Sequence, residues 1–300
     1  MLDKGQDDDW FSSNFIRWLA FGAAAGFAAF LVWELLIAYP IVNLRVLADR
    51  NLSIGVLMSL TVGAILYGTT AALPQFLQNL MGYTATESGL VMSPRGFGAV
   101  IGSIVAGRII SKIDSRVWMA QGAVWLAFSM FVVGNVTLQI APGNVIWPII
   151  LSGFAVTSLF VPMTTLSVAT VSREQMGDAT GLTSLVRNLG GSVGISLVTA
   201  MVTRREQVHQ ALLVGHMSPY QGPFRQQLAM LQNSLATQSG SATAQHQAYA
   251  VMYRTLQQQA GLWAYVDEFR FLALVCLVCI PLTLLFRKPP KMPGEPSLAH

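Results

Sequence analysis

Long apolar runs alternate with short polar segments along this chain of 300 residues. Most of the runs are roughly 18 residues long or longer and carry few or no charges, which is the pattern of helices that cross a membrane. A lone helix suits a bilayer because it satisfies all its backbone polar groups internally. The runs predict seven membrane-spanning helices, over residues 17–37, 52–77, 88–110, 117–138, 146–168, 179–202 and 269–286.

Proline, glycine and polar residues mark the connections between these helices. Pro74 predicts a kink in the second helix, and residues 141–144 predict a turn before the fifth. A polar segment over residues 203–268, rich in Gln, Ser and Ala, separates the last two helices. Its later part, residues 245–264, can form an amphipathic helix.

The composition supports an all-α membrane protein. The chain is 53% hydrophobic and 11% charged, whereas a soluble domain carries about 25% charged residues. The alternating pattern of a membrane β-barrel is absent from the sequence. The net charge of +4 is assigned to loops, and no nucleic-acid partner is expected because basic clusters with interleaved aromatic residues are absent.

The segment GRIISKIDSR, residues 107–116, sets the orientation of the helices. Cationic loops stay on the cytoplasmic side, so alternation places residues 43–51, 172–178 and the tail 287–300 there too. The short loops on the other side, residues 78–87 and 139–145, contain no Lys or Arg. The N-terminus, with an acidic loop over residues 1–16, and the polar segment 203–268 are then outside, and the C-terminus is inside.

Arg95 and Arg187 fall within predicted membrane helices. Such arginines are costly at this depth and face the bundle interior or a wet cavity. One interpretation is that these two arginines line a substrate path. The alternative is that their side chains extend to a membrane interface and donate hydrogen bonds to backbone carbonyl groups. Gly190 and Gly194 have the spacing that permits close helix packing. No Asp or Glu is expected at membrane depth from the second to the seventh helix, and Glu34 is expected at an interface.

Catalytic and metal sites are not expected. His209, His216 and His246 lack metal-ligand spacing, and no hydrolase, metalloprotease or phosphate-binding motif occurs. Cys276 and Cys279 are interpreted as small buried residues. The sequence therefore predicts a protein that is not an enzyme and holds no metal and no cofactor.

Several segments together resemble the EmrB/QacA type of fourteen-span drug:proton antiporters in the major facilitator superfamily, and its EmrB-like members above all. Their order and spacing match over nearly the whole chain. They are LDKGQDDDWF (2–11), WELLIAYPIVNLRVLADRNLSIG (33–55), LPQFLQNLMGYTATESGL (73–90), GRIISKIDSR (107–116), GFAVTSLFVPMTTLS (153–167), SLVRNLGGSVGISL (184–197), RREQVH (204–209) and KPP (288–290).

The resemblance implies the C-terminal half of such a transporter. Residues 52–286 would form its six-helix C-domain, with residues 203–268 as a long periplasmic loop. Residues 17–51 would form a linker helix and a cytoplasmic loop. The N-terminal half would lie outside this sequence and would hold the site for the coupling proton. The candidate cavity residues are Gln75, Arg95, Met163, Thr164, Arg187 and Asn188.

The segment 107–116 would be the cytoplasmic loop motif of the superfamily, with Ser111 at its acidic position. The candidate gating residues are Gly107, Arg108, Lys112, Asp114, Arg116 and Asp178, and Arg108 and Lys112 would pair with Asp178.

The implied function is proton-driven efflux of amphipathic drugs across the bacterial inner membrane by alternating access. The implied partners are membrane lipid, the N-terminal half, a periplasmic adaptor that docks on residues 203–268, and an outer-membrane channel. Two alternatives stay open: an inert truncated fragment, and a non-transporting membrane scaffold or regulator.

Overall fold

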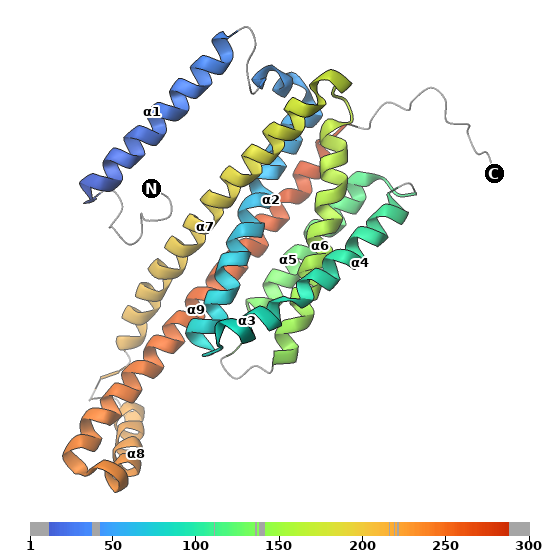
Figure 1. Ribbon diagram of the computed structural model, residues 1–300. Helices are drawn as coiled ribbons and strands as arrows, with labels where there is room; N and C mark the ends of the chain where they lie inside the picture. The colour runs from blue at the N-terminus through green and yellow to red at the C-terminus, as the bar shows by residue number, and fades with distance from the viewer. Residues whose placement is uncertain are drawn as a thin grey trace.

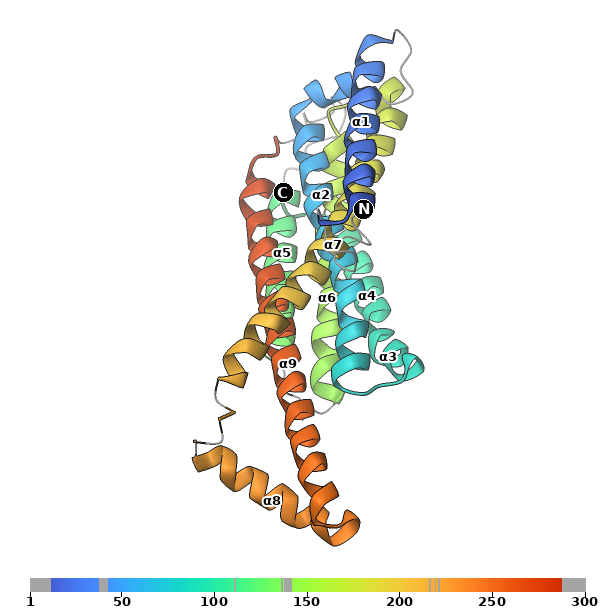
Figure 2. The ribbon, with the colours of Figure 1, turned by 90° about the vertical axis from the view of Figure 1, so that its left-hand side faces the viewer.

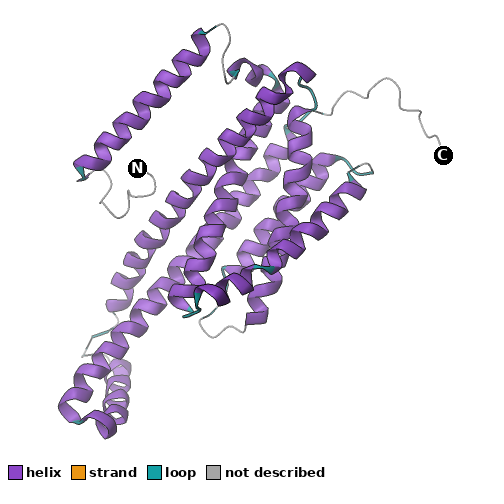
Figure 3. Ribbon diagram, viewed as in Figure 1, coloured by secondary structure: helices purple, strands orange, loops and turns teal. Residues whose placement is uncertain are grey.

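The regular structure of the chain is helical. The computed structural model describes residues 12–37, 43–110, 112–135, 137, 142–215, 217–218, 220 and 222–287, and no strand occurs among them (Figure 3). The long helices are α1 (Asn14–Leu36), α2 (Arg50–Gln75), α3 (Ala85–Met92), α4 (Pro94–Ile109), α5 (Ser115–Val133), α6 (Pro142–Val168), α7 (Met176–Val214), α8 (Gly222–Ser239) and α9 (Ser241–Leu284). The short elements are η2 (Leu44–Ala48), η3 (Phe76–Leu80) and η4 (Arg173–Gln175). The all-α prediction is confirmed.

Six helical stretches are long and apolar enough to cross a membrane. They coincide with the first six predicted spans and are Asn14–Leu36, Arg50–Leu80, Ala85–Ile109, Ser115–Val133, Gly143–Val168 and Arg173–Val214. The seventh predicted span, residues 269–286, falls in the second half of α9, and the count of seven stays a prediction. The predicted acidic loop 1–16 and tail 287–300 lie mostly outside the described residues.

Two pairs of long neighbouring helices form the bundle. α2 packs along α7, α4 packs along α6, and the two pairs meet where α2 contacts α6 (Figure 1). α5 and α9 pack on one another and on these pairs, so they cover one side of the bundle (Figure 2).

α1 stands beside the bundle, not in it (Figure 1). It carries large exposed apolar side chains on several faces, such as Trp18, Phe21, Phe27 and Trp33. An apolar helix with so little protein contact suits a lipid environment, and the assignment of α1 as a linker helix stays a prediction.

The ends of the first and last bundle helices are tied together. The Asn51 side chain donates a hydrogen bond to the Arg287 carbonyl (3.1 Å) and accepts one from the Arg287 amide (2.8 Å). Asp49 caps α2 by accepting from the Leu52 amide (2.9 Å), and it also accepts from the Thr170 hydroxyl (2.8 Å). These polar groups bring residues far apart in sequence to one end of the bundle.

The prolines shape the helices in ways that local rules explain. Pro74 has no amide hydrogen, and the helix widens after it into the π-helical segment η3. Pro94 begins α4, so the predicted span 88–110 is divided at Ser93 into α3 and α4. The predicted turn over residues 141–144 is wrong from Pro142 onward, because α6 already begins there; proline fits a first helical position.

The polar segment 203–268 is a helical extension of the bundle (Figure 1). α7 continues to Val214, α8 follows, and α9 runs for 44 residues from the tip into the bundle. At 1.5 Å per residue α7 is about 58 Å long, well beyond the roughly 30 Å of a bilayer core. The predicted helix over residues 245–264 is confirmed as part of α9.

Aromatic side chains join η3 to α9 where this extension meets the bundle. The ring centroid of Phe76 lies 5.5 Å from that of Tyr265 and 6.1 Å from that of Phe269, both edge-on. Phe76 and Phe269 are among the largest fully buried side chains. This junction is therefore a packed part of the core.

Candidate functional site

Arg95 connects α4 to α2 in the bundle. Its Nη1 donates to the Thr70 hydroxyl (3.2 Å) and its Nη2 to the Thr69 hydroxyl (3.5 Å). Both hydroxyl groups donate their own hydrogens to the Leu66 carbonyl, at 3.0 and 2.7 Å. Their lone pairs are thereby left to face the guanidinium.

No carboxylate forms an ion pair with Arg95 within the described part of the chain. Arg95 also borders a small void of about 10 Å³ with Thr69, Ser129 and Ser152. That volume is close to what one water molecule needs, although most of the lining is apolar, with Leu73, Met130 and Phe269 among its residues. Among the described residues, Arg95 is thus a cation held by the hydroxyl groups of α2.

Arg187 occupies a different place, between α7 and α6. Its guanidinium carbon lies 5.1 Å from the centroid of the Phe160 ring, a geometry that stabilises a cation by about 0.5–2 kcal/mol. The neighbouring Asn188 accepts a long hydrogen bond from the Tyr67 hydroxyl (3.5 Å). Arg187 and Asn188 thus form a second polar group, with contacts on α6 and α2.

The other predicted cavity residues do not join these groups. Gln75 is exposed near the end of α2. Met163 is fully buried, with its sulfur 4.0 Å from the Ser59 hydroxyl. Thr164 is half-buried and donates to the Val161 carbonyl (2.9 Å). In this conformation the six residues are spread over α2, α4, α6 and α7.

Gly190 and Gly194 lie where α7 meets the backbone of α2. A Cβ atom at Gly190 would overlap the Leu60 carbonyl, and one at Gly194 would overlap the Ala64 carbonyl. Gly63 meets the Arg187 carbonyl from the other side. Backbones that approach this closely leave no room for a side chain at the contact.

A second glycine contact joins α4 to α6, and the sequence reading missed it. A Cβ at Gly98 would overlap the Ile150 carbonyl, and one at Gly153 would overlap the Arg95 carbonyl. Gly102 also meets α6, at Thr157. Gly98 and Gly102 are four residues apart, the same spacing that marked Gly190 and Gly194, so the signal was present in the sequence.

The basic loop 107–116 makes a short connection between α4 and α5. Asp114 caps α5 by accepting from the Arg116 amide (3.1 Å). Gly107 is exposed and a Cβ there would meet no atom within 4 Å. The Nε atom of Arg116 is buried without a hydrogen-bond partner. Ser111 lies outside the described residues.

The predicted pairing of Arg108 and Lys112 with Asp178 would join residues on or next to helices that pack on different neighbours. Asp178 lies in the first turn of α7, and α7 packs on α2 and α9, whereas α4 packs on α6. The pairing stays a prediction.

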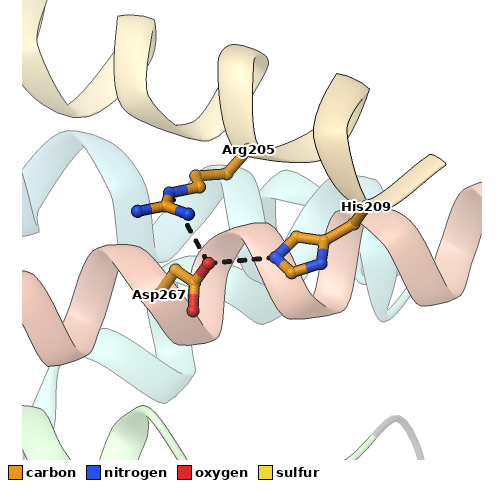
Figure 4. A network of polar contacts seen from close by, with 3 residues as sticks. All are labelled: Arg205, His209 and Asp267. Atoms are coloured by element: carbon orange, nitrogen blue, oxygen red, sulfur yellow. Dashed lines mark hydrogen bonds and ion pairs between the residues drawn. The ribbon is translucent and has the colours of Figure 1, made fainter. Parts of the chain in front are cut away.

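A polar contact joins α7 to α9 (Figure 4). Asp267 Oδ2 lies 2.9 Å from His209 Nε2 and 3.6 Å from Arg205 Nε. All three side chains are partly exposed. Residues 204–209 were recognised from sequence as a motif, but their partner on α9 was not.

We expect His209→Ala to loosen this α7–α9 contact, because it removes a hydrogen bond to a carboxylate. The loss is about 1 kcal/mol, since the pair is partly exposed. It should appear as a lower unfolding temperature of the purified protein at neutral pH. His246→Ala, on an exposed part of α9, is the control; equal effects of both changes would argue against the contact.

One carboxyl group is buried just before the seventh predicted span, outside the helices that were expected to carry no acid. Glu268 on α9 is fully buried, and neither of its oxygens has a hydrogen-bond partner. It directly precedes the predicted span 269–286, at the junction where η3 packs on α9. The sequence placed Glu268 in the polar segment, and nothing local indicated its burial.

The whole chain is similar to membrane transporters. The Major Facilitator Superfamily profile matches residues 10–195. "Fatty acid resistance protein FarB" of Neisseria gonorrhoeae is 33% identical over 290 residues, which cover 96% of this chain and 56% of FarB. "Multidrug export protein EmrB" of Escherichia coli (strain K12) is 33% identical over 297 residues, which cover 97% of this chain and 55% of EmrB.

A solved structure shows a similar fold. It is a bacterial homologue of the human lysosomal transporter Spinster, with a TM-score of 0.50 and 15% identity, covering 81% of this chain and 52% of that one. The chain thus spans about half the length of these relatives. Its helical runs, its fold and the profile match agree: the chain belongs to the Major Facilitator Superfamily, as an EmrB-like member.

Proposed function

We propose that this chain forms the C-terminal half of a proton-driven exporter of amphipathic molecules that works by alternating access. The observation that carries the proposal is the 33% identity, over nearly the whole chain, to proteins named for multidrug export and fatty acid resistance. In this superfamily the substrate site lies between two six-helix halves. Transporters of this kind are not enzymes, which agrees with the absence of catalytic motifs from the sequence.

A second half would cover the exposed apolar side chains of α2, α4 and α7. Leu60 and Tyr67 on α2 are exposed, as are Ile101 on α4 and Leu189 and Val193 on α7. Contiguous exposed apolar surface marks a contact with another protein or with lipid. The second half belongs to the same polypeptide or to a separate one, and with it α2, α4, α6 and α7 would enclose the substrate path.

The charges within the bundle favour anionic and neutral amphipathic substrates. Arg95 lies in the first turn of α4 and Arg187 lies within α7, and α2, α4, α5 and α6 carry no Asp or Glu. A site with this balance attracts a carboxylate or another anionic head group and disfavours a cation. Fatty acids, for which FarB is named, are anionic amphipathic molecules at neutral pH.

The helical extension is proposed as the docking surface for a periplasmic adaptor in the bacterial inner membrane, with an outer-membrane channel beyond it. α7, α8 and α9 border a half-open, mainly apolar cavity of about 420 Å³, lined among others by Leu213, Phe224, Leu231 and Leu256. The proposed orientation, with the helical extension in the periplasm, would put the N-terminus outside and the C-terminus in the cytoplasm.

The first test is to purify the natural product from membranes with a tag after His300 and to determine its intact mass, its N-terminal sequence and any co-purifying membrane protein. The assembly is then reconstituted in vesicles and assayed for export of an anionic amphipathic dye. Export that needs a proton gradient and a second six-helix half is expected. A stable assembly without export would support a scaffold, and a chain that neither assembles nor transports would support an inert fragment.

A further inference from the structure

Glu268 is a buried carboxyl group that no other side chain satisfies. Its exposed fraction is 0%, and both Oε1 and Oε2 lack a hydrogen-bond partner among the described residues. An isolated carboxylate in such surroundings is strongly disfavoured relative to the neutral acid. Buried polar groups are nearly always paired, so an unpaired one needs a functional or structural reason.

The position of Glu268 on α9 explains its surroundings. At 100° per residue it shares one stripe of the helix with Gly261, Tyr265, Leu272 and Cys276. Gly261 meets Leu80 of η3, and the other three residues belong to the main buried core. Glu268 is therefore a single acidic group in an otherwise apolar or weakly polar stripe that faces the bundle.

The groups that could neutralise Glu268 lie elsewhere. Asp267, next to it, is turned toward α7, where it contacts His209 and Arg205 (Figure 4). Arg270 donates instead to the Asn135 side chain (3.0 Å) after the end of α5. No residue of the described chain forms an ion pair with Glu268.

The helices packed against α9 contribute few charges of their own. α2 and η3 hold only Arg50, at the far end, and α5 holds only Arg116, also at the far end. α8 holds only Arg225, and α7 offers Arg204, Arg205, Glu206 and His209 near the junction and Asp178 and Arg187 further away. Of the helices beyond these, α6 has no charged residue. Arg95 and Arg108 are the charges of α4.

The titration behaviour of the junction agrees with this geometry. Burial raises the pKa of Glu268 to about 8. Burial, followed by the nearby charge of Glu268, raises the pKa of Tyr265 to about 12, although a hydrogen bond with Asn79 opposes the rise. Tyr265 therefore keeps its proton at neutral pH, and Glu268 is the group that can gain or lose one.

We propose that Glu268 is a proton-binding site in this half of the transporter, filled from the outer side at the junction of α7 and α9. This inference deepens the proposed export function and rests on it for the coupling role. A proton from water binds a Glu268 oxygen when α9 and η3 move apart. It is held as the neutral carboxylic acid while α9 and η3 are packed together. It leaves to water when Glu268 is next exposed. The partly exposed contact of Asp267, His209 and Arg205 lies beside this route and closes it in the present conformation.

The direct test is infrared titration of the purified chain in detergent or nanodiscs. The carbonyl absorbance of a protonated carboxyl group should disappear with a midpoint near 8 in the native protein. It should be absent from Glu268→Gln and unchanged in Glu174→Gln, a matched change at an exposed position on η4. Survival of this band in Glu268→Gln, or its absence from the native protein, would overturn the proposal.

Thermal unfolding gives an independent reading that needs no transport. Because the folded pKa of Glu268 is raised above the ordinary 4.5, the folded state binds the extra proton, and stability falls as pH rises from 4.5 to about 8. The native unfolding temperature should drop by several degrees over this range. Glu268→Gln keeps the size and neutrality of the acid, so it should fold and should lose most of that drop; an unchanged drop would contradict the assignment.

The coupling role is tested in vesicles that hold the complete transporter. Glu268→Gln should reduce proton-driven uphill export at least tenfold while it retains exchange of substrate at equal concentrations on both sides. Native-like uphill export by the variant would overturn the coupling role. If no protein transports anything but the infrared band behaves as expected, the export function fails and the proton site stands.

Discussion

Replacing Gly190 with alanine is expected to separate α7 from α2 and to destabilise the bundle severely. The added Cβ would overlap the Leu60 carbonyl oxygen, which belongs to a helical backbone and cannot rotate away. Forcing extra volume into a tight contact costs about 1–3 kcal/mol, and more where backbone must shift. A lower unfolding temperature and a smaller monodisperse fraction in size-exclusion chromatography would show the effect.

The matched control is Gly181→Ala, the same change two to three helical turns earlier on α7. A Cβ at Gly181 would meet nothing within 4 Å, and alanine favours a helix by about 1 kcal/mol over glycine. This variant should therefore be as stable as the native protein or slightly more so. Similar behaviour of the two variants would show that the α2–α7 contact is not as close as the structure indicates.

Replacing Arg95 with glutamine is expected to lower export of anionic amphipathic substrates by about tenfold or more. The change removes the charge that the Thr69 and Thr70 hydroxyl groups hold in the bundle. A charge-assisted hydrogen bond contributes about 1.5–3 kcal/mol, which corresponds to roughly a tenfold to hundredfold change in affinity. Export rates for an anionic and a neutral dye of similar size, measured side by side, would reveal the selective loss.

Arg95→Lys and Arg254→Gln complete this experiment. Lysine keeps the charge but not the planar pair of donors that reaches both threonines, so an intermediate loss is expected. Arg254 is exposed on the part of α9 outside the bundle, and its change to glutamine should leave export intact. Equal loss of export for anionic and neutral dyes in Arg95→Gln would indicate a structural role. It would contradict the proposal that the charge of Arg95 attracts anionic substrates.

The glycine contacts of α2–α7 and α4–α6 indicate which surfaces stay together during transport. Close backbone packing in a membrane depends on shape, and such contacts hold each pair as a unit. Alternating access in this superfamily is largely movement of one half against the other. The rigid pairs therefore favour movement between halves over movement within this one.

The hydrophobic pattern was enough to predict the fold class and the first six long apolar helices. That information is local, because crossing a bilayer demands only length, apolarity and internal hydrogen bonds. The spacing of Gly190 and Gly194 also indicated a close contact, although not the partner, and Pro74 indicated a break in regular helix. The family resemblance came from motifs in order, which required no knowledge of packing.

The functional contacts depended on tertiary structure. Arg95 meets Thr70, 25 residues away, and His209 meets Asp267, 58 residues away. The extension of α7 to Val214 and the helix α8 were not predicted, because helices outside a bilayer need not be apolar on every face. Glu268 shows most clearly what cannot be predicted from sequence. Its local sequence is polar, and only the packing of η3 against α9 removes its side chain from water. Membrane crossing is a property of each segment by itself, whereas burial and pairing are set by the neighbours that the fold supplies.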